Sequence, residues 1–170
     1  QKGLDNEGKR RIDKIVTEDK CVESLYELIK EWESNGNYPF TDVSIQYAIE
    51  LLLKAKKLKQ VHRIFILLNK KDFHLLESAY LLSLSYAIEN DNNEFLNNIF
   101  KSFIIWLSNF ISHEGGLATD PEYDIIELLM KAEKKELLMD LFKFCFDNNY
   151  NWYFMESFDF MLGKNNSFTI

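Results

Sequence analysis

Apolar residues recur every three to four positions along most of this chain, and short polar breaks separate the apolar stretches. Leu25, Leu28, Ile29 and Trp32, for example, fall on one side of a helix. This spacing, with only two prolines and six glycines, predicts an all-α protein, because a β-sandwich or barrel needs many more turn residues. Nine helices are expected: residues 7–16, about 20–34, one capped by Thr41 or Asp42, about 58–68, 74–89, 93–112, 122–134, 135–148 and 152–162.

The breaks between the expected helices are short and rich in Asn, Lys and Gly, as at 35–37, 54–57, 90–93 and 148–151. Short connectors force consecutive helices to lie antiparallel and in contact. The sequence therefore predicts antiparallel hairpins stacked as an α-solenoid segment, a single helical-repeat domain over residues 1–170. The chain starts at Gln1-Lys2-Gly3, so we expect either a processed start or a piece of a longer array.

Composition and charge narrow the classes of function. A hydrophobic fraction of 46% is enough for a packed core. The net charge of −7 disfavours a protein whose main task is to grip phosphate backbones, because that binding is driven by cations on the protein. The Lys-rich segment 54–59 is the strongest local electrostatic feature. It is read either as solubilising helix ends or as a contact for an acidic peptide or a phosphate.

The two cysteines, Cys21 and Cys145, lie far apart within apolar helical patterns, where a free thiol behaves as a small hydrophobe. We therefore expect no disulfide framework and an intracellular location in the cytoplasm, nucleus or mitochondrion. The longest apolar stretch, 99–111, is interrupted by polar residues and is shorter than the ~20 residues of a membrane span. No membrane insertion is expected.

Two segments of the chain carry a shared pattern. Residues 49–58 read IELLLKAKKL and residues 126–135 read IELLMKAEKK. Each is followed at the same offset by an apolar-Phe pair, ending in Phe65 and Phe142. Phe100 lies between them, 35 residues after Phe65 and 42 before Phe142, and the longer step contains the Gly115-Gly116 loop.

These segments resemble the pentatricopeptide repeat and, more distantly, the tetratricopeptide repeat, whose paired helices recur at about this length. Lys54-Ala55 and Lys131-Ala132 match the "KAG" break of the pentatricopeptide family, with Lys56 and Glu133 in place of its Gly. The resemblance covers residues 20–150. It implies an α-solenoid and RNA binding, with the fourth residue of each first helix reading a base: Gln46, Leu81 and Tyr123.

Candidate chemistry is sparse. The three histidines, His62, His74 and His113, are far apart in the sequence and do not combine with the cysteines at ligand spacing. Paired acids such as Glu27 and Glu31 are typical of a solvated helix face. We therefore expect no catalytic residue, no metal and no cofactor.

The sequence favours a non-catalytic scaffold that binds another protein or peptide within an intracellular assembly. Three regions are candidates for the contact: one face of the third helix, position 123, and the aromatic C-terminal segment. The candidate partner-binding residues are Asp42, Gln46, Glu50, Lys54, Tyr123, Trp152 and Phe158. The alternative is an organellar RNA-binding protein of the pentatricopeptide type.

Overall fold

The computed structural model describes residues 5–36, 39–71, 77–114 and 122–149, and it describes no side chain at 39–42, 110–114 or 122–123. The described residues form eight α-helices and no strand, which confirms the predicted all-α class for this part of the chain. The expected ninth helix, 152–162, lies outside it. The helices are α1 (Asn6–Ile15), α2 (Cys21–Ser34), α3 (Pro39–Lys54), α4 (Leu58–Lys70), α5 (Glu77–Glu89), α6 (Asn93–Glu114), α7 (Glu122–Lys131) and α8 (Lys135–Asp147).

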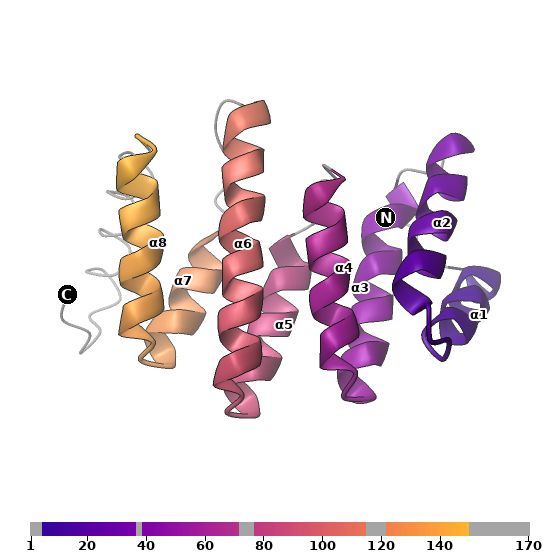
Figure 1. Cartoon of the computed structure of the whole chain (residues 1–170), viewed down its shortest axis with the longest axis horizontal. Coiled ribbons are helices and arrows are strands. Elements are labelled where there is room, and N and C mark those ends of the chain that lie inside the picture. The colour runs from indigo at the N-terminus through magenta and orange to yellow at the C-terminus, as the bar shows by residue number, and fades with distance from the viewer. Residues whose placement is uncertain (1–4, 37–38, 72–76, 115–121, 150–170) are drawn as a thin grey trace. The chain divides into compact units, whose positions relative to one another are not determined.

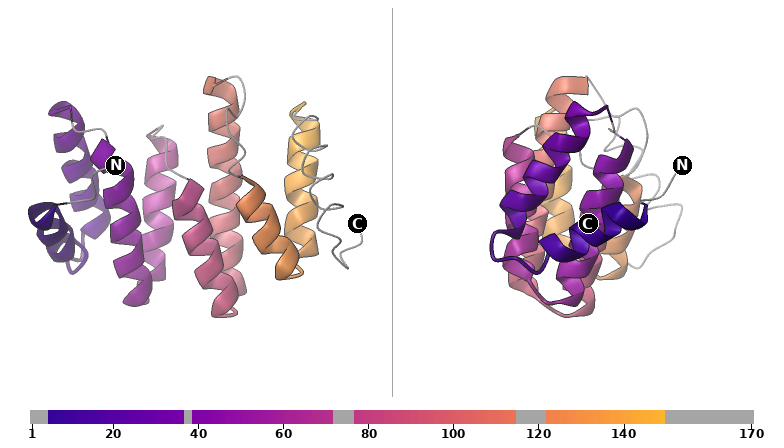
Figure 2. Two further views of the ribbon diagram at one scale, coloured as in Figure 1. Left: turned by 180° about the vertical axis from the view of Figure 1, so that it is seen from behind. Right: turned by 90° about the vertical axis from the view of Figure 1, so that its right-hand side faces the viewer.

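The chain divides into two compact units, Gln1–Ser102 and Phe103–Ile170. In the first unit α3 is central, since it contacts α1, α2, α4 and α5 (Figure 1). Helices α1, α3 and α5 form one layer of this unit, and α2 and α4 lie in the other with the beginning of α6 (Figure 2). In the second unit α7 packs against α8.

The start of α3 differs from the sequence prediction. Thr41 or Asp42 was expected to cap this helix, but α3 already begins at Pro39, so both residues lie within its first turn. Proline is favoured at the first helical position because its fixed φ suits the helix and its missing N–H would have no partner there. The prediction was wrong because it took Pro39 as the end of the preceding turn.

The hairpins α3–α4, α5–α6 and α7–α8 are closed by the same turn. In each turn one residue other than glycine has a left-handed backbone: Lys56 (φ 58°), Asp91 (φ 51°) and Glu133 (φ 56°). Its amide donates to the carbonyl three residues earlier, and the next amide donates to the carbonyl five residues before itself. These are the two bonds of a Schellman motif, which satisfy the last carbonyls of a helix. The left-handed residues are 35 (56 to 91) and 42 (91 to 133) residues apart.

Burial follows the same register in the three hairpins. The residues five and nine positions after the left-handed residue are buried, as is the residue seven positions before it. These buried residues are Val61, Leu96 and Leu138, then Phe65, Phe100 and Phe142, and before the turn Ile49, Leu84 and Ile126. Each hairpin therefore places the same three positions in the core at a fixed distance from the same turn.

Replacing Lys56 by glycine is expected to stabilise the protein by about 0.5–1 kcal/mol, because a left-handed backbone costs a residue with a Cβ roughly 1–2 kcal/mol and costs glycine little. Lys54→Gly is the matched control: Lys54 is also exposed and is the last residue of α3. Lys54→Gly removes the same charge, but it is expected to destabilise the protein by up to about 1 kcal/mol because glycine is unfavourable within a helix. Urea unfolding followed by circular dichroism measures both, and equal effects would contradict the assignment of strain to Lys56.

Candidate functional site

Helices α1, α3 and α5 are each the first helix of a hairpin, and their polar side chains form a continuous row in the first unit. The Tyr47 hydroxyl on α3 donates to Asp13 Oδ1 on α1 at 2.7 Å, and the Ser78 hydroxyl on α5 donates to Gln46 Oε1 on α3 at 3.1 Å. Glu50 follows Gln46 one turn later on α3. We call these five residues, Asp13, Gln46, Tyr47, Glu50 and Ser78, the first-helix surface.

Two of the candidate partner-binding residues, Gln46 and Glu50, belong to this surface. Gln46 and Glu50 are half-buried, and Lys54 is exposed. Asp42 and Tyr123 lie in α3 and α7, but their side chains are outside the described set. Trp152 and Phe158 lie outside the described residues altogether.

The exposure of these positions recurs from one hairpin to the next. The positions equivalent to Glu50 are Ser85 on α5 and Glu127 on α7, and all three are half-buried. The positions equivalent to Lys54 are Glu89 and Lys131, and all three are exposed. On α7 these two positions form an ion pair, with Lys131 Nζ 2.9 Å from Glu127 Oε1. Each first helix thus presents two polar positions to solvent at a fixed distance from its turn.

The hydrogen bonds of the first-helix surface set what it can offer a partner. The Tyr47 hydroxyl already donates its proton to the Asp13 carboxylate, and this bond raises the pKa of Tyr47. Sequence reasoning missed Tyr47, Asp13 and Ser78. They do not follow the four-residue spacing that singled out Gln46 and Glu50, and their partners lie on other helices.

A shallow groove of about 600 Å³ lies between α1 and α2. Arg11 forms two bonds across it to Glu31, at 2.7 and 3.2 Å, and these bonds lower the pKa of Glu31. Lys30 pairs with Glu27 at 3.0 Å on the same wall. The four charged side chains of the described lining are therefore paired with one another. Its lining residues are Arg11, Ile15, Ser24, Glu27, Leu28, Lys30, Glu31 and Ser34.

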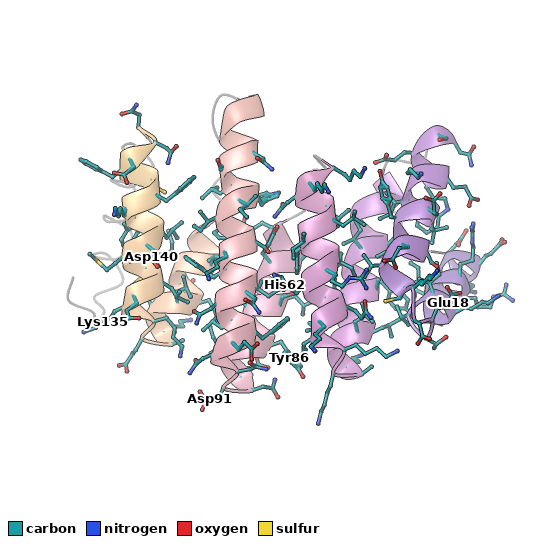
Figure 3. The ribbon with its side chains drawn as sticks, viewed as in Figure 1. Glu18, His62, Tyr86, Asp91, Lys135 and Asp140 are labelled. Carbon is teal, nitrogen blue, oxygen red and sulfur yellow. The ribbon has the colours of Figure 1, made fainter. Side chains whose placement is uncertain are left out.

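Among the described side chains, those of Cys21, Cys145 and His62 are candidates for acid-base or nucleophilic chemistry, and His74 and His113 lie outside this set. Cys21 and Cys145 are buried, as their apolar pattern predicts, and burial raises the pKa of the Cys21 thiol. Burial also lowers the pKa of the half-buried His62 on α4 (Figure 3). Across the described ranges, no group of three or more His, Cys, Asp or Glu residues is arranged to hold a metal ion.

None of the described helices is long and apolar enough to cross a membrane. The chain matches no protein-family model, and neither a curated protein nor a solved structure is detectably similar to it.

Proposed function

We propose that this chain is a non-catalytic helical-repeat scaffold that binds another protein or peptide through its first-helix surface. The observation that carries the proposal is the recurrence of one hairpin design, with the same turn and the same buried positions, after Lys56, Asp91 and Glu133. A helix hairpin cannot bury its apolar face alone, so neighbouring hairpins stack and leave one row of first helices available for contact. Such rows are typical binding surfaces of helical-repeat proteins.

The charge of the first helices favours a protein partner over RNA. The first-helix surface contains two carboxylates, Asp13 and Glu50, and no lysine or arginine. A negative surface repels a phosphate backbone, whose binding depends on the release of counterions by cations. The positions that would read RNA bases also fit poorly: the Gln46 side-chain oxygen accepts from Ser78, and Leu81 has no hydrogen-bonding group in its side chain.

A crosslinking experiment tests the protein-binding proposal. A photoreactive amino acid at Glu50 is expected to crosslink to a partner protein in extracts of cells that express the chain. The same group at Lys101, an exposed residue of α6 in the other layer of the first unit, serves as the control. The captured protein is then purified and titrated against the chain. Glu50→Lys is expected to weaken binding at least about tenfold, because a charge placed opposite its complement becomes repulsive.

Three results would overturn the proposal. The first is equal crosslinking from Glu50 and Lys101, and the second is a purified partner that binds Glu50→Lys as well as the native chain. The third is a mobility shift with single-stranded RNA that has a steep salt dependence and is lost in Gln46→Ala and Tyr123→Ala. That third result would support the RNA-binding alternative.

A further inference from the structure

A group of basic residues lies on α4, the second helix of its hairpin, and not on the first-helix surface. Between Glu50 and Asp72 the chain has seven basic residues and no acidic one, although its net charge is −7. Three of these cations line one face of α4: Lys59, Arg63 and Lys70. This concentration of one sign of charge creates a local positive field on an otherwise acidic protein.

The exposed face of α4 also carries an apolar residue at its centre. Lys59, Arg63, Ile66 and Lys70 are spaced four, three and four residues apart, which places them in one stripe along the helix. Ile66 is 50% exposed, one of four large hydrophobic residues with such exposure among those described. We call these four residues the α4 stripe. It is about 16 Å long, since a helix rises about 1.5 Å per residue.

Contacts on both sides of α4 hold this stripe outward. On the α2 side, Arg63 is ion-paired with Glu23, and Lys71 lies 5.7 Å from the centre of the Tyr26 ring. On the α6 side, Asn69 Nδ2 donates to the Ser102 carbonyl at 2.9 Å. The opposite face of α4 is buried in the core. Within the described part of the chain, Lys59 and Lys70 form no hydrogen bond or ion pair, so both charges are available to a ligand.

We propose that the α4 stripe docks an acidic, amphipathic helical segment of a partner protein. Lys59 and Lys70 complement Asp and Glu side chains of such a helix, and Ile66 contacts an apolar residue between them. A phosphate backbone would use the cations but would leave Ile66 exposed, and the net charge of −7 opposes it. A partner helix of about 12 residues spans the stripe. The inference rests on the proposed scaffold function and names the chemistry of one partner.

The test uses the full chain and a fluorescent, helix-stabilised peptide of about 12 residues, with Leu along one face and Glu on its flanks. Binding is measured by fluorescence anisotropy. The double variant Lys59→Gln/Lys70→Gln is expected to weaken binding about tenfold or more, and Ile66→Ser to weaken it further. Binding is also expected to weaken as salt rises from about 0.05 to about 0.5 M, because exposed charges are screened.

Matched controls distinguish binding at the α4 stripe from non-specific electrostatic attraction between the peptide and the protein. Lys143→Gln removes an exposed lysine from α8 and is expected to leave binding unchanged. A peptide with Gln in place of every Glu keeps the apolar face and is expected to bind at least about tenfold more weakly. Circular dichroism checks that each variant is folded.

Four results would overturn the inference. They are no binding of the Glu peptide, equal binding of the Gln peptide, equal loss in Lys143→Gln, and tighter binding of single-stranded polyuridine that is lost in the same double variant. Failure here is distinguishable from failure of the proposed function, because crosslinking from Glu50 on α3 uses neither α4 nor the peptide. If a protein is captured at Glu50 but the peptide does not bind α4, only this inference is contradicted and the proposed function is not.

Discussion

Replacing Phe65 by alanine is expected to lower the free energy of unfolding by about 3–5 kcal/mol, the largest effect of any single change discussed for this protein. The Phe65 side chain is 0% exposed, and its ring stacks on the Tyr80 ring with centroids 4.3 Å apart and an interplanar angle of 25°. Alanine removes the buried ring area and leaves a cavity between α4 and α5, which the surrounding helices can only partly fill. Urea unfolding followed by circular dichroism measures the loss.

Ile66→Ala is the neighbouring control on the same helix. Because Ile66 is half exposed, this change is expected to cost below about 1 kcal/mol. The same comparison can be made within α8, where Phe142 is 3% and Phe146 is 62% exposed. Phe142→Ala is expected to destabilise much more than Phe146→Ala. If the exposed and buried members of either pair had equal effects, the core assignment would be wrong.

Replacing Tyr80 by phenylalanine is expected to cost about 1–2 kcal/mol even though the ring is retained. The Tyr80 hydroxyl lies 3.2 Å from Asn69 Oδ1 and 3.3 Å from the Ser102 carbonyl, and Asn69 Nδ2 donates to the same carbonyl at 2.9 Å. These bonds join α4, α5 and α6 in the interior of the first unit. Loss of the hydroxyl leaves the Asn69 oxygen without this buried donor.

A double-mutant cycle of Tyr80→Phe and Asn69→Ala is expected to give a coupling energy of about 0.5–3 kcal/mol, because the two side chains share one network. Pairing Tyr80→Phe with Val22→Ala on α2 serves as the control, since Val22 is buried away from these bonds, and additive effects are expected there. Additivity of Tyr80→Phe and Asn69→Ala would show that the bonds contribute independently.

The buried Tyr80 hydroxyl is expected to make the free energy of unfolding depend on pH. Burial raises the pKa of Tyr80 above its ordinary value of 10.0. The native state therefore keeps the Tyr80 proton at pH values at which the unfolded state loses it. This contribution to stability is complete below pH 10.0 and falls as pH rises above it. Tyr80→Phe is expected to lose less stability than the native chain over that range.

Much of the fold follows from local sequence. The turns predicted at 54–57 and 90–93 are found where Lys56 and Asp91 adopt left-handed backbones. The break predicted at 35–37 contains Gly36, with φ 75°. Helix periodicity and turn residues act over a few positions, so they can be recognised without knowledge of the packing. The start of α3 at Pro39 was missed because proline both ends a turn and begins a helix.

The candidate site was predictable only in part. Four-residue spacing identified Gln46, Glu50 and Lys54 as one polar face of α3, and the structure places Glu50 and Lys54 at half-buried and exposed positions. The same spacing could not identify Ser78 as the partner of Gln46, since the two residues are 32 positions apart. Of the α4 stripe, the Lys-rich segment 54–59 that was recognised in the sequence contains only Lys59, because which residues share the exposed face depends on which face of α4 is buried.

By itself the sequence determined that the described chain is helical, where most of its helices break, and which apolar residues, such as Leu25, Leu28 and Ile29, share a buried helix face. Only the tertiary structure decided that α3 is the central helix of its unit and that Tyr80, Asn69 and Ser102 meet inside it. The physical reason is that the two kinds of interaction act over different distances along the sequence. Helix periodicity and turn geometry are set by neighbours along the chain, whereas hydrogen bonds between helices depend on how the finished helices pack.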